Sequence, residues 1–471
     1  MRNKLVYKYL GKVLIVLSFL IIIPIIVSFA LNENILPFLI PLLISLVLGT
    51  LLSNIKTENK NLYAKDGFVI VTMSWLLISI IGAIPFIIGD NLSIFDAFFE
   101  SVSGFTTTGA SIYKDVEHLT YGLKFWRAFM HFIGGMGVLA FVMAIVPLSK
   151  NDKSMHVLKA EMPGPSVAKL VPSIKKTLFY LYLIYIGLTT TEFILLLIGG
   201  LHPFDSLLVS LSTAGTGGFS SLNTSLATFT VFNKWVVTIF MFLFGVNFNI
   251  YFLIIMKDLK TALKSEELKI YLIIYLLSTL FIISNTYSMF DNILTAITEG
   301  AFHVSSIMTS TGFSVGDINI YNTPCRILFL LLMIISACAG STCGGFKISR
   351  LIICFKSIKR DILKTFHPNS VRTITFEDKK VDESTVKSIS TYLLLYIGIM
   401  LILMFLISFD NITFTQTINA VFTTFGNVGL CFDISNFSEF SNFSKLVLSI
   451  GMLFGRLEIF PIIVWASSFK R

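Results

Sequence analysis

Charged residues and cysteines are scarce in this sequence. Only 13% of the 471 residues are charged, about half the share of an ordinary soluble domain. The five cysteines are odd in number and show no CxxC spacing. They indicate neither a disulfide framework nor a zinc site, and we interpret them as small apolar packing residues. Strand-like alternation of apolar and polar residues over about ten positions is also missing, which excludes a membrane β-barrel.

Long apolar runs are what the sequence has instead. Hydrophobic residues make up 55% of the chain, and the mean hydropathy is +0.82. Runs of about 20 residues recur, which is the length that crosses a hydrocarbon core about 30 Å thick. We therefore predict an all-α integral membrane protein, with a retained first helix in place of a signal peptide. The expected spanning helices are residues 13–31, 36–52, 68–88, 125–148, 178–198, 235–255, 270–288, 327–354, 392–409 and 446–465.

Positive charge follows the side of the membrane. The formal net charge is +9. If both termini are cytoplasmic, most Lys and Arg residues fall in cytoplasmic segments, as the positive-inside rule requires. We expect membrane lipid as a partner and no nucleic acid, because no basic groove with interleaved aromatic residues is found. The basic residues expected on the outer side are Lys114, Lys124, Lys234, Arg326 and Lys445.

A short segment recurs four times between pairs of spanning helices. The copies are residues 95–111, 204–220, 291–314 and 412–429, and each is moderately apolar and rich in Thr, Ser and Gly near its end. At 1.5 Å per residue such a segment is too short to cross a membrane, so we interpret it as re-entrant. The sequence predicts four helix–pore-helix–helix repeats around a central ion pore. The expected division is an N-terminal hairpin at 1–60 and repeats at 61–150, 151–260, 261–380 and 381–471.

The ends of these segments are the candidate ion filter. Bare backbone at membrane depth is tolerated where it lines an aqueous path, and glycine lets carbonyl groups face an ion without crowding it. One Thr-Gly pair is also typical of a helix C-cap, but four between spanning helices indicate a cation filter. The fourth copy alone has Phe before its glycine. The candidate filter residues are Thr107, Thr108, Gly109, Gly215, Thr216, Gly217, Ser310, Thr311, Gly312, Thr424, Phe425 and Gly426.

A glycine-rich hexapeptide interrupts the apolar run at residues 327–354. Such a stretch breaks a helix, and the freed carbonyl and hydroxyl groups need water or an ion. Close helix packing through small residues is the alternative. A phosphate-binding loop is rejected, because Phe346 separates Lys347 from the last glycine. The residues of the interruption are Gly340, Ser341, Thr342, Cys343, Gly344 and Gly345.

These features resemble the superfamily of potassium transporters that includes the Trk, Ktr and plant HKT proteins. The resemblance extends from about residue 68 to the C-terminus, and the extra hairpin is more similar to TrkH-type members than to KtrB. His131 and Phe132 depart from the usual Gln-Trp of the family, and Cys343 stands where Gly is common. The further similar stretches are HFIGGMGV at 131–138, EMPGP at 161–165, AGSTCGGFK at 339–347 and GRLEIF at 455–460.

The resemblance implies channel-like K⁺ uptake across a prokaryotic cytoplasmic membrane, driven by the membrane potential. It also implies a homodimer that is gated by a cytoplasmic, TrkA-like nucleotide-binding ring, with K⁺ at the filter residues and no nucleotide bound by this chain. In the family the hexapeptide lies beneath the filter, which makes residues 340–347 the candidate gating loop. Arg456 then points toward the pore as a fixed positive charge, and pairing with a carboxylate or helix-end carbonyls is its alternative role.

The sequence leaves two alternative functions open for the chain. A Na⁺-permeable or cation-coupled symporter of the same superfamily is the alternative, although Gly109 stands where Na⁺-favouring members often carry Ser. A proton-pumping enzyme subunit is less expected, because it needs a chain of intramembrane Lys, Glu or His, and we predict no enzymatic activity. Arg127 is expected to snorkel outward. His131, Glu192 and His303 are expected to be satisfied polar residues between helices.

Overall fold

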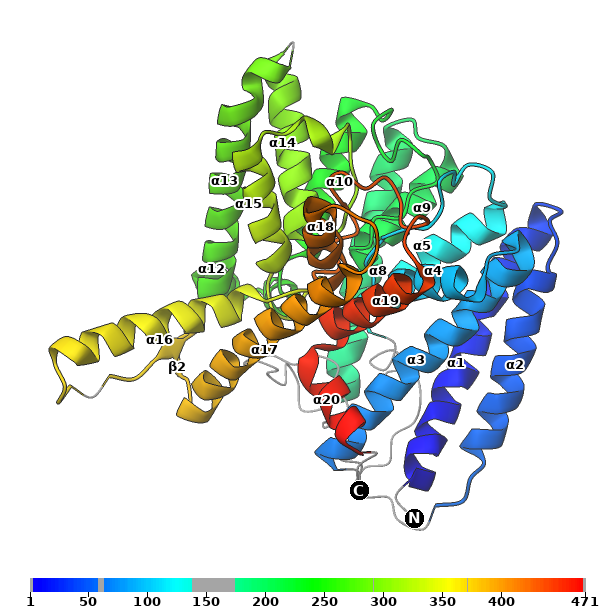
Figure 1. Cartoon of the computed structure of the whole chain (residues 1–471), viewed down its shortest axis with the longest axis horizontal. Coiled ribbons are helices and arrows are strands. Elements are labelled where there is room, and N and C mark those ends of the chain that lie inside the picture. The colour runs from blue at the N-terminus through cyan, green and yellow to red at the C-terminus, as the bar shows by residue number, and fades with distance from the viewer. Residues whose placement is uncertain (1–2, 58–62, 138–173, 291, 371, 469–471) are drawn as a thin grey trace.

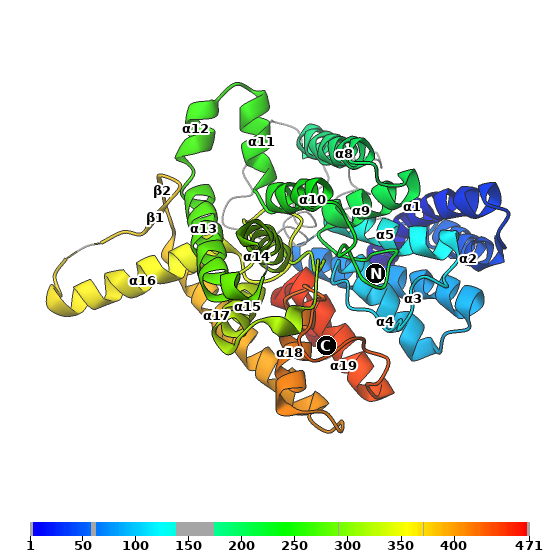
Figure 2. The ribbon, with the colours of Figure 1, turned by 90° about the horizontal axis from the view of Figure 1, so that it is seen from above.

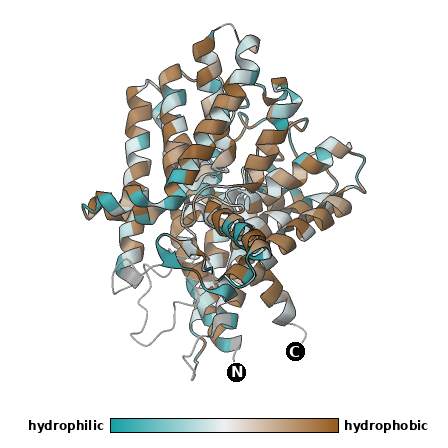
Figure 3. Ribbon diagram, turned by 90° about the vertical axis from the view of Figure 1, so that its left-hand side faces the viewer, coloured by the Kyte–Doolittle hydropathy of each residue, from teal (hydrophilic) through white to brown (hydrophobic). Residues whose placement is uncertain are grey.

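The long apolar runs fold into membrane-length helices. The computed structural model describes residues 3–57, 63–137, 174–290, 292–370 and 372–468. Within these ranges six helices are long and apolar enough to cross a membrane, and two bent helix pairs would each make one further span. Figure 1 shows the elements as one helical assembly. Hydrophobic residues cover most of the long helices, and hydrophilic residues gather toward the helix ends (Figure 3).

Four units each contain an outer helix, a short pore helix and an inner helix, as predicted. Figure 2 shows the units around a common centre. We call the face at which the pore helices begin the outer face, and the opposite face the inner face. In order, the units are α3 (Ala64–Asp90), α4 (Ile94–Phe105) and α5 (Tyr121–Gly135); α8 (Ile174–Ile198), α9 (Pro203–Gly215) and α10 (Val231–Phe244); α13 (Glu266–Thr286), α14 (Ile293–Met308) and α15 (Thr323–Ile334); and α17 (Glu383–Ile407), α18 (Phe414–Phe425) and α19 (Asn442–Leu457).

The predicted N-terminal hairpin is formed by α1 (Asn3–Ala30) and α2 (Leu36–Ser53). Glycine lets the two helices approach closely, since a Cβ on Gly11 would lie 2.4 Å from the backbone of α2. The turn between them carries Glu33, which accepts two backbone N–H groups at the start of α5, at 2.8 and 2.9 Å. Because such N–H groups have no partner within their own helix, Glu33 fastens the hairpin to the first unit.

Two inner helices break where the sequence predicts continuous spans. The expected helix at 235–255 is α10 followed by α11 (Phe248–Ile255) with a bend of 93°, and the helix at 446–465 is α19 followed by α20 (Ile459–Ser468) with a bend of 113°. Apolar residues on both sides hide these breaks from hydropathy. Residues 138–148 of the expected helix at 125–148, and the EMPGP stretch at 161–165, lie outside the described residues.

The third unit is interrupted more widely than predicted. Residues 335–347 separate α15 from α16 (Ile348–Phe366), so the break is longer than residues 340–345. A short antiparallel hairpin, β1 (Thr375–Phe376) and β2 (Lys379–Lys380), connects α16 to α17. Both α16 and this hairpin extend away from the central units (Figure 2). The remaining short elements are α12 (Leu259–Lys264), η1 (Tyr287–Met289) and η2 (Ile318–Ile320).

Candidate functional site

Each pore helix ends in the same backbone turn. One residue takes the left-handed conformation, and the amide of the next residue bonds to the carbonyl five residues back, at 2.8 or 2.9 Å. This hydrogen bond is that of a Schellman helix ending. Because the turn recurs with nearly one φ, the backbone leaves the four helices in equivalent ways. The left-handed residues are Thr107, Thr216, Ser310 and Asn427, with φ between 52° and 55°.

A glycine with positive φ follows two residues later in every repeat. These ring glycines are Gly109, Gly218, Gly312 and Gly429, with φ between 73° and 83°. Each lies against a carbonyl oxygen of the next repeat, and the four contacts close a ring. The distances from an added Cβ to that oxygen are 1.9 Å from Gly109 to Gly217, 2.1 Å from Gly218 to Thr311, 1.9 Å from Gly312 to Val428 and 2.1 Å from Gly429 to Thr108.

This ring joins glycines to carbonyl groups from all four repeats. A side chain at any ring glycine would meet both an unfavourable φ and a backbone oxygen. The carbonyl ends of four pore helices, which carry partial negative charge, lie immediately before the ring. Backbone carbonyls arranged in this way can replace the water around a dehydrated cation. The ring is therefore the candidate filter.

The positions of the ring glycines differ from those expected from the sequence in two repeats. In repeats one and three the expected triplets end on the ring glycines Gly109 and Gly312. In repeats two and four the ring glycines are Gly218 and Gly429, which follow the last glycines of the expected triplets, Gly217 and Gly426. A usable signal was present, since each ring glycine precedes an apolar residue and then Ser or Cys.

Several expected filter residues instead pack behind the ring. A Cβ on Gly215 would lie 2.2 Å from the His131 carbonyl oxygen, so this glycine permits contact between α9 and α5. Phe425 is fully buried, and its ring centroid lies 4.5 Å from that of Tyr396. Thr424 donates to the Ala420 carbonyl at 2.6 Å within α18.

Pore-helix hydroxyl groups hold the segment that returns from the ring in three repeats. The bonds run from Ser212 to the Phe219 carbonyl at 2.9 Å, from Ser306 to Phe313 at 2.7 Å and from Thr423 to Leu430 at 2.6 Å. Ser103 occupies the same position in repeat one. Its buried hydroxyl has no hydrogen-bond partner in the described part of the chain.

Repeat one carries a buried ion pair that the sequence alone does not predict. Arg127 donates through Nε to Glu100 at 2.8 Å, and both side chains are buried. Glu100 also accepts the Ile112 amide at 3.0 Å, and Arg127 donates to Ser111 Oγ at 3.0 Å and the Ser220 carbonyl at 3.3 Å. The expectation that Arg127 snorkels outward is wrong, because it braces the return segments of repeats one and two. Opposite charges within apolar segments of one repeat were the available signal.

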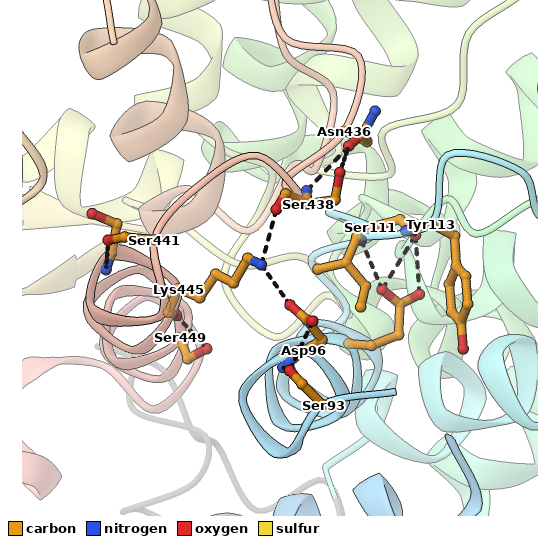
Figure 4. A network of polar contacts seen from close by, with 12 residues as sticks. Ser93, Asp96, Ser111, Tyr113, Asn436, Ser438, Ser441, Lys445 and Ser449 are labelled. Carbon is orange, nitrogen blue, oxygen red and sulfur yellow. Dashed lines mark hydrogen bonds and ion pairs between the residues drawn. The ribbon is translucent and has the colours of Figure 1, made fainter. Parts of the chain in front are cut away.

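Polar contacts join neighbouring repeats on the outer face. Lys445 at the start of α19 donates to Asp96 in the first turn of α4 at 2.6 Å, which joins repeat four to repeat one (Figure 4). A side-chain hydrogen bond from Asn223 lowers the pKa of the Asp115 carboxyl. The contacts at the other junctions are Asn223 with Asp115 at 2.8 Å, Leu226 with Ser314 at 2.9 Å and Arg326 with Asp433 at 3.3 Å.

Residues 335–347 lie against the inner side of the ring. The Gly344 amide donates to Ser310 Oγ at 3.1 Å, and a Cβ on Gly344 would lie 2.6 Å from Asn427 Oδ1. Ser310 and Asn427 are the left-handed residues of repeats three and four. The structure therefore brings the predicted hexapeptide to the candidate filter.

The same loop docks into the break between α10 and α11. Cys338 donates its amide to the Gly245 carbonyl, and the Gly340 carbonyl accepts the Phe248 amide, each at 3.1 Å. Backbone groups released by the break in repeat two are thus paired with those released in repeat three. Lys347 donates from Nζ to carbonyls within the loop.

Arg456, in the last turn of α19, joins three repeats below the ring. Its guanidinium donates to the carbonyls of Thr342 in the loop and of Gly134 and Gly135 at the end of α5. Pairing with helix-end carbonyls was the alternative role considered for this residue, and these contacts have that form. The cationic side chain also suits the negative ends of α5 and α19.

The three polar residues that we expect to have hydrogen-bond partners between helices differ in their contacts. His303 bonds through Nδ1 to the Tyr321 hydroxyl at 2.8 Å. His131 stacks on Phe219 with 4.2 Å between ring centroids. Within the described ranges the ring nitrogens of His131 have no hydrogen-bond partner, so the expectation for His131 is wrong. The buried Glu192 carboxyl lies beside the Thr213 hydroxyl of α9.

Fold and site together define a membrane protein in which four pore-helix repeats enclose a ring of glycines and backbone carbonyl groups. Comparison with known proteins places the chain within that class. The chain belongs to the TrkH family of cation transport proteins, whose family model matches residues 37–470.

Individual relatives agree in length and fold. The chain is 31% identical over 422 residues to the Trk system potassium uptake protein TrkH of Salmonella typhimurium, covering 87% of this chain and 86% of that protein. It is also 31% identical over 427 residues to the Trk system potassium uptake protein TrkG of Escherichia coli K12, covering 88% and 87%. The crystal structure of the potassium transporter TrkH from Vibrio parahaemolyticus matches with a TM-score of 0.90 and 26% identity over 100% of both chains.

Proposed function

We propose that the chain takes up K⁺ across a prokaryotic cytoplasmic membrane through the ring of four backbone carbonyls. The closed set of glycine–carbonyl contacts is the observation that carries this proposal. The relatives named as potassium uptake proteins support K⁺ as the ion. Uptake is channel-like, and the membrane potential drives it with about 2.3 kcal/mol per charge per 100 mV.

The gate of this pathway is the loop at residues 335–347. Its contacts with Ser310 and Asn427, which each precede a ring glycine by two residues, support the proposal. The inner face is cytoplasmic. There a TrkA-like nucleotide-binding ring acts on a dimer of this chain, which itself binds no nucleotide.

Ion flux into liposomes that hold the purified protein tests the ion and the driving force. We expect K⁺ and Rb⁺ to enter faster than Na⁺ and Li⁺, at a rate set by the imposed potential. Equal K⁺ and Na⁺ rates would favour the Na⁺-permeable alternative. A K⁺ flux that needs a Na⁺ or H⁺ gradient would favour a symporter.

Arg456→Gln tests the gate. The substitution removes a charged donor from the Thr342 carbonyl, so we expect the loop to open more often and K⁺ flux per folded molecule to rise severalfold. Arg372→Gln, on an exposed arginine near the β1–β2 hairpin, is the matched control and should leave flux unchanged. Normal flux with lower thermal stability would show that Arg456 only holds the helices together.

A further inference from the structure

Glu267 is a buried carboxylate at the inner end of α13 that the filter does not use. It is 2% exposed. Its Oε1 accepts the Ala339 amide at 2.7 Å and the Ser349 amide at 3.1 Å. Ala339 precedes the glycine-rich stretch and Ser349 follows it. One oxygen therefore bridges the two flanks of the glycine-rich stretch within the loop at residues 335–347.

Both amides need this acceptor. Ser349 lies in the first turn of α16, where amides have no partner within the helix and where the helix dipole favours a carboxylate. Ala339 lies in non-helical backbone at membrane depth, where an unpaired amide is costly. Loss of the Glu267 carboxylate would leave two buried donors unsatisfied.

A second carboxylate, on the inner surface, contacts the start of α13 at Glu267. Glu377, in the turn between β1 and β2, accepts the Ser265 hydroxyl at 2.8 Å and the Glu267 amide at 3.1 Å. Lys356 of α16 donates to Glu266 at 2.7 Å and to a carbonyl of β1 at 2.8 Å. Figure 2 shows the hairpin beside α13 and α16. The surface hairpin is thus linked to the loop by two successive carboxylates.

We propose that Glu267 is a positioning residue for residues 335–347, and that the β1–β2 hairpin acts on it through Glu377. A displacement of the hairpin withdraws Glu377 from the start of α13, and Glu267 then releases the two loop amides. Coupling between two sites requires an element whose conformation both can change. Here that element is the contact of Glu267 with the loop amides, which joins the hairpin to the loop. The effect on K⁺ flux rests on the proposed function of the loop as a gate, whereas the effect on loop exposure does not.

The test measures loop exposure and K⁺ flux separately. Cys338 and Cys343 are buried in the loop, so their modification by a small maleimide reports its release, in a full-length chain whose other three cysteines are changed to Ala. Glu267→Ala should raise the modification rate about tenfold or more, because two bonds to a buried acceptor are lost. Glu267→Gln keeps an acceptor oxygen and should raise it less. Glu266→Ala, which removes only the neighbouring bond to Lys356, should change it less than about twofold.

Glu377→Ala provides a surface variant in case Glu267→Ala does not fold. We expect a faster rate here as well, between those of Glu266→Ala and Glu267→Ala. An unchanged rate in folded Glu267→Ala overturns the positioning role, and an unchanged rate in Glu377→Ala overturns the link to the hairpin. Faster modification with unaltered K⁺ flux would keep the positioning role and overturn the proposed gate instead.

Discussion

Repeats one and three differ from repeats two and four in their side chains, although all four share one backbone. The hydroxyl groups of Thr106 and Thr108 lie 2.7 Å apart in repeat one, and those of Thr309 and Thr311 lie 2.7 Å apart in repeat three. The same positions carry no hydroxyl in repeats two and four. A backbone that repeats four times is thus lined by side chains that repeat twice.

A second position alternates in the same way. Glu100 of α4 accepts the Ile112 amide at 3.0 Å, and His303 of α14 accepts the equivalent Val315 amide at 3.5 Å. Repeats two and four have apolar residues at this position of the pore helix. The comparison teaches that the four repeats share φ angles and carbonyl groups, while polar side chains support opposite repeats in pairs.

We expect Glu100→Gln, in repeat one, to have the largest effect on stability. The change leaves the buried Arg127 without its ionic partner, which costs about 3–5 kcal/mol. We expect a large drop in the free energy of unfolding of the purified protein, measured by thermal unfolding in detergent. His303→Gln, which exchanges neutral groups in the equivalent repeat, should cost about 1 kcal/mol.

The double variant Glu100→Gln with Arg127→Gln serves as the control for charge. It should recover part of the loss, because no unpaired charge remains. Equal losses for the Glu100 and His303 single variants would show that the ion pair adds nothing beyond a neutral hydrogen bond.

Alanine at a ring glycine tests the shared backbone. Gly109→Ala and Gly218→Ala come from the two classes of repeat, yet each should lower the K⁺/Na⁺ flux ratio by roughly tenfold. Alanine there meets a left-handed backbone, which costs it about 1–2 kcal/mol, and a carbonyl oxygen of the next repeat, so the ring carbonyls must shift. A loss of about 1.4 kcal/mol in ion discrimination corresponds to a factor of ten. Gly398→Ala in α17 is the matched control, because its Cβ would meet nothing within 4 Å. A normal ratio for Gly218→Ala alone would show that the ring is not four-fold.

Much of the fold follows from local patterns in the sequence. Apolar length predicts α2 to within one residue, since the expected 36–52 is Leu36–Ser53, and the recurring Thr/Ser-Gly segments predict four pore helices. Glycine and small residues predict the loop near residues 340–345. These features depend on hydropathy and backbone preference, which are properties of short stretches.

What the sequence does not predict depends on contacts between distant segments. The register of the ring in repeats two and four is set by neighbours such as Thr311 and Thr108 from other repeats. The bend at Glu458 occurs between two apolar helices, and hydropathy cannot locate it. The partners of Arg127 and Glu267 lie on other elements, so their roles follow from the fold and not from their local sequence.

The smallest expected effects on stability concern two equivalent pore-helix hydroxyl groups, Ser103 in repeat one and Ser306 in repeat three. Ser306→Ala removes the bond to the Phe313 carbonyl and should cost about 1 kcal/mol in unfolding free energy, with a modest fall in the K⁺/Na⁺ flux ratio because the return segment loses its anchor. Ser103→Ala removes a hydroxyl that has no partner in the described ranges, so it should lie within about 0.5 kcal/mol of the unchanged protein. Thermal unfolding and paired K⁺ and Na⁺ flux measure both. If Ser103→Ala costs as much as Ser306→Ala, a bound water anchors repeat one as the hydroxyl bond anchors repeat three.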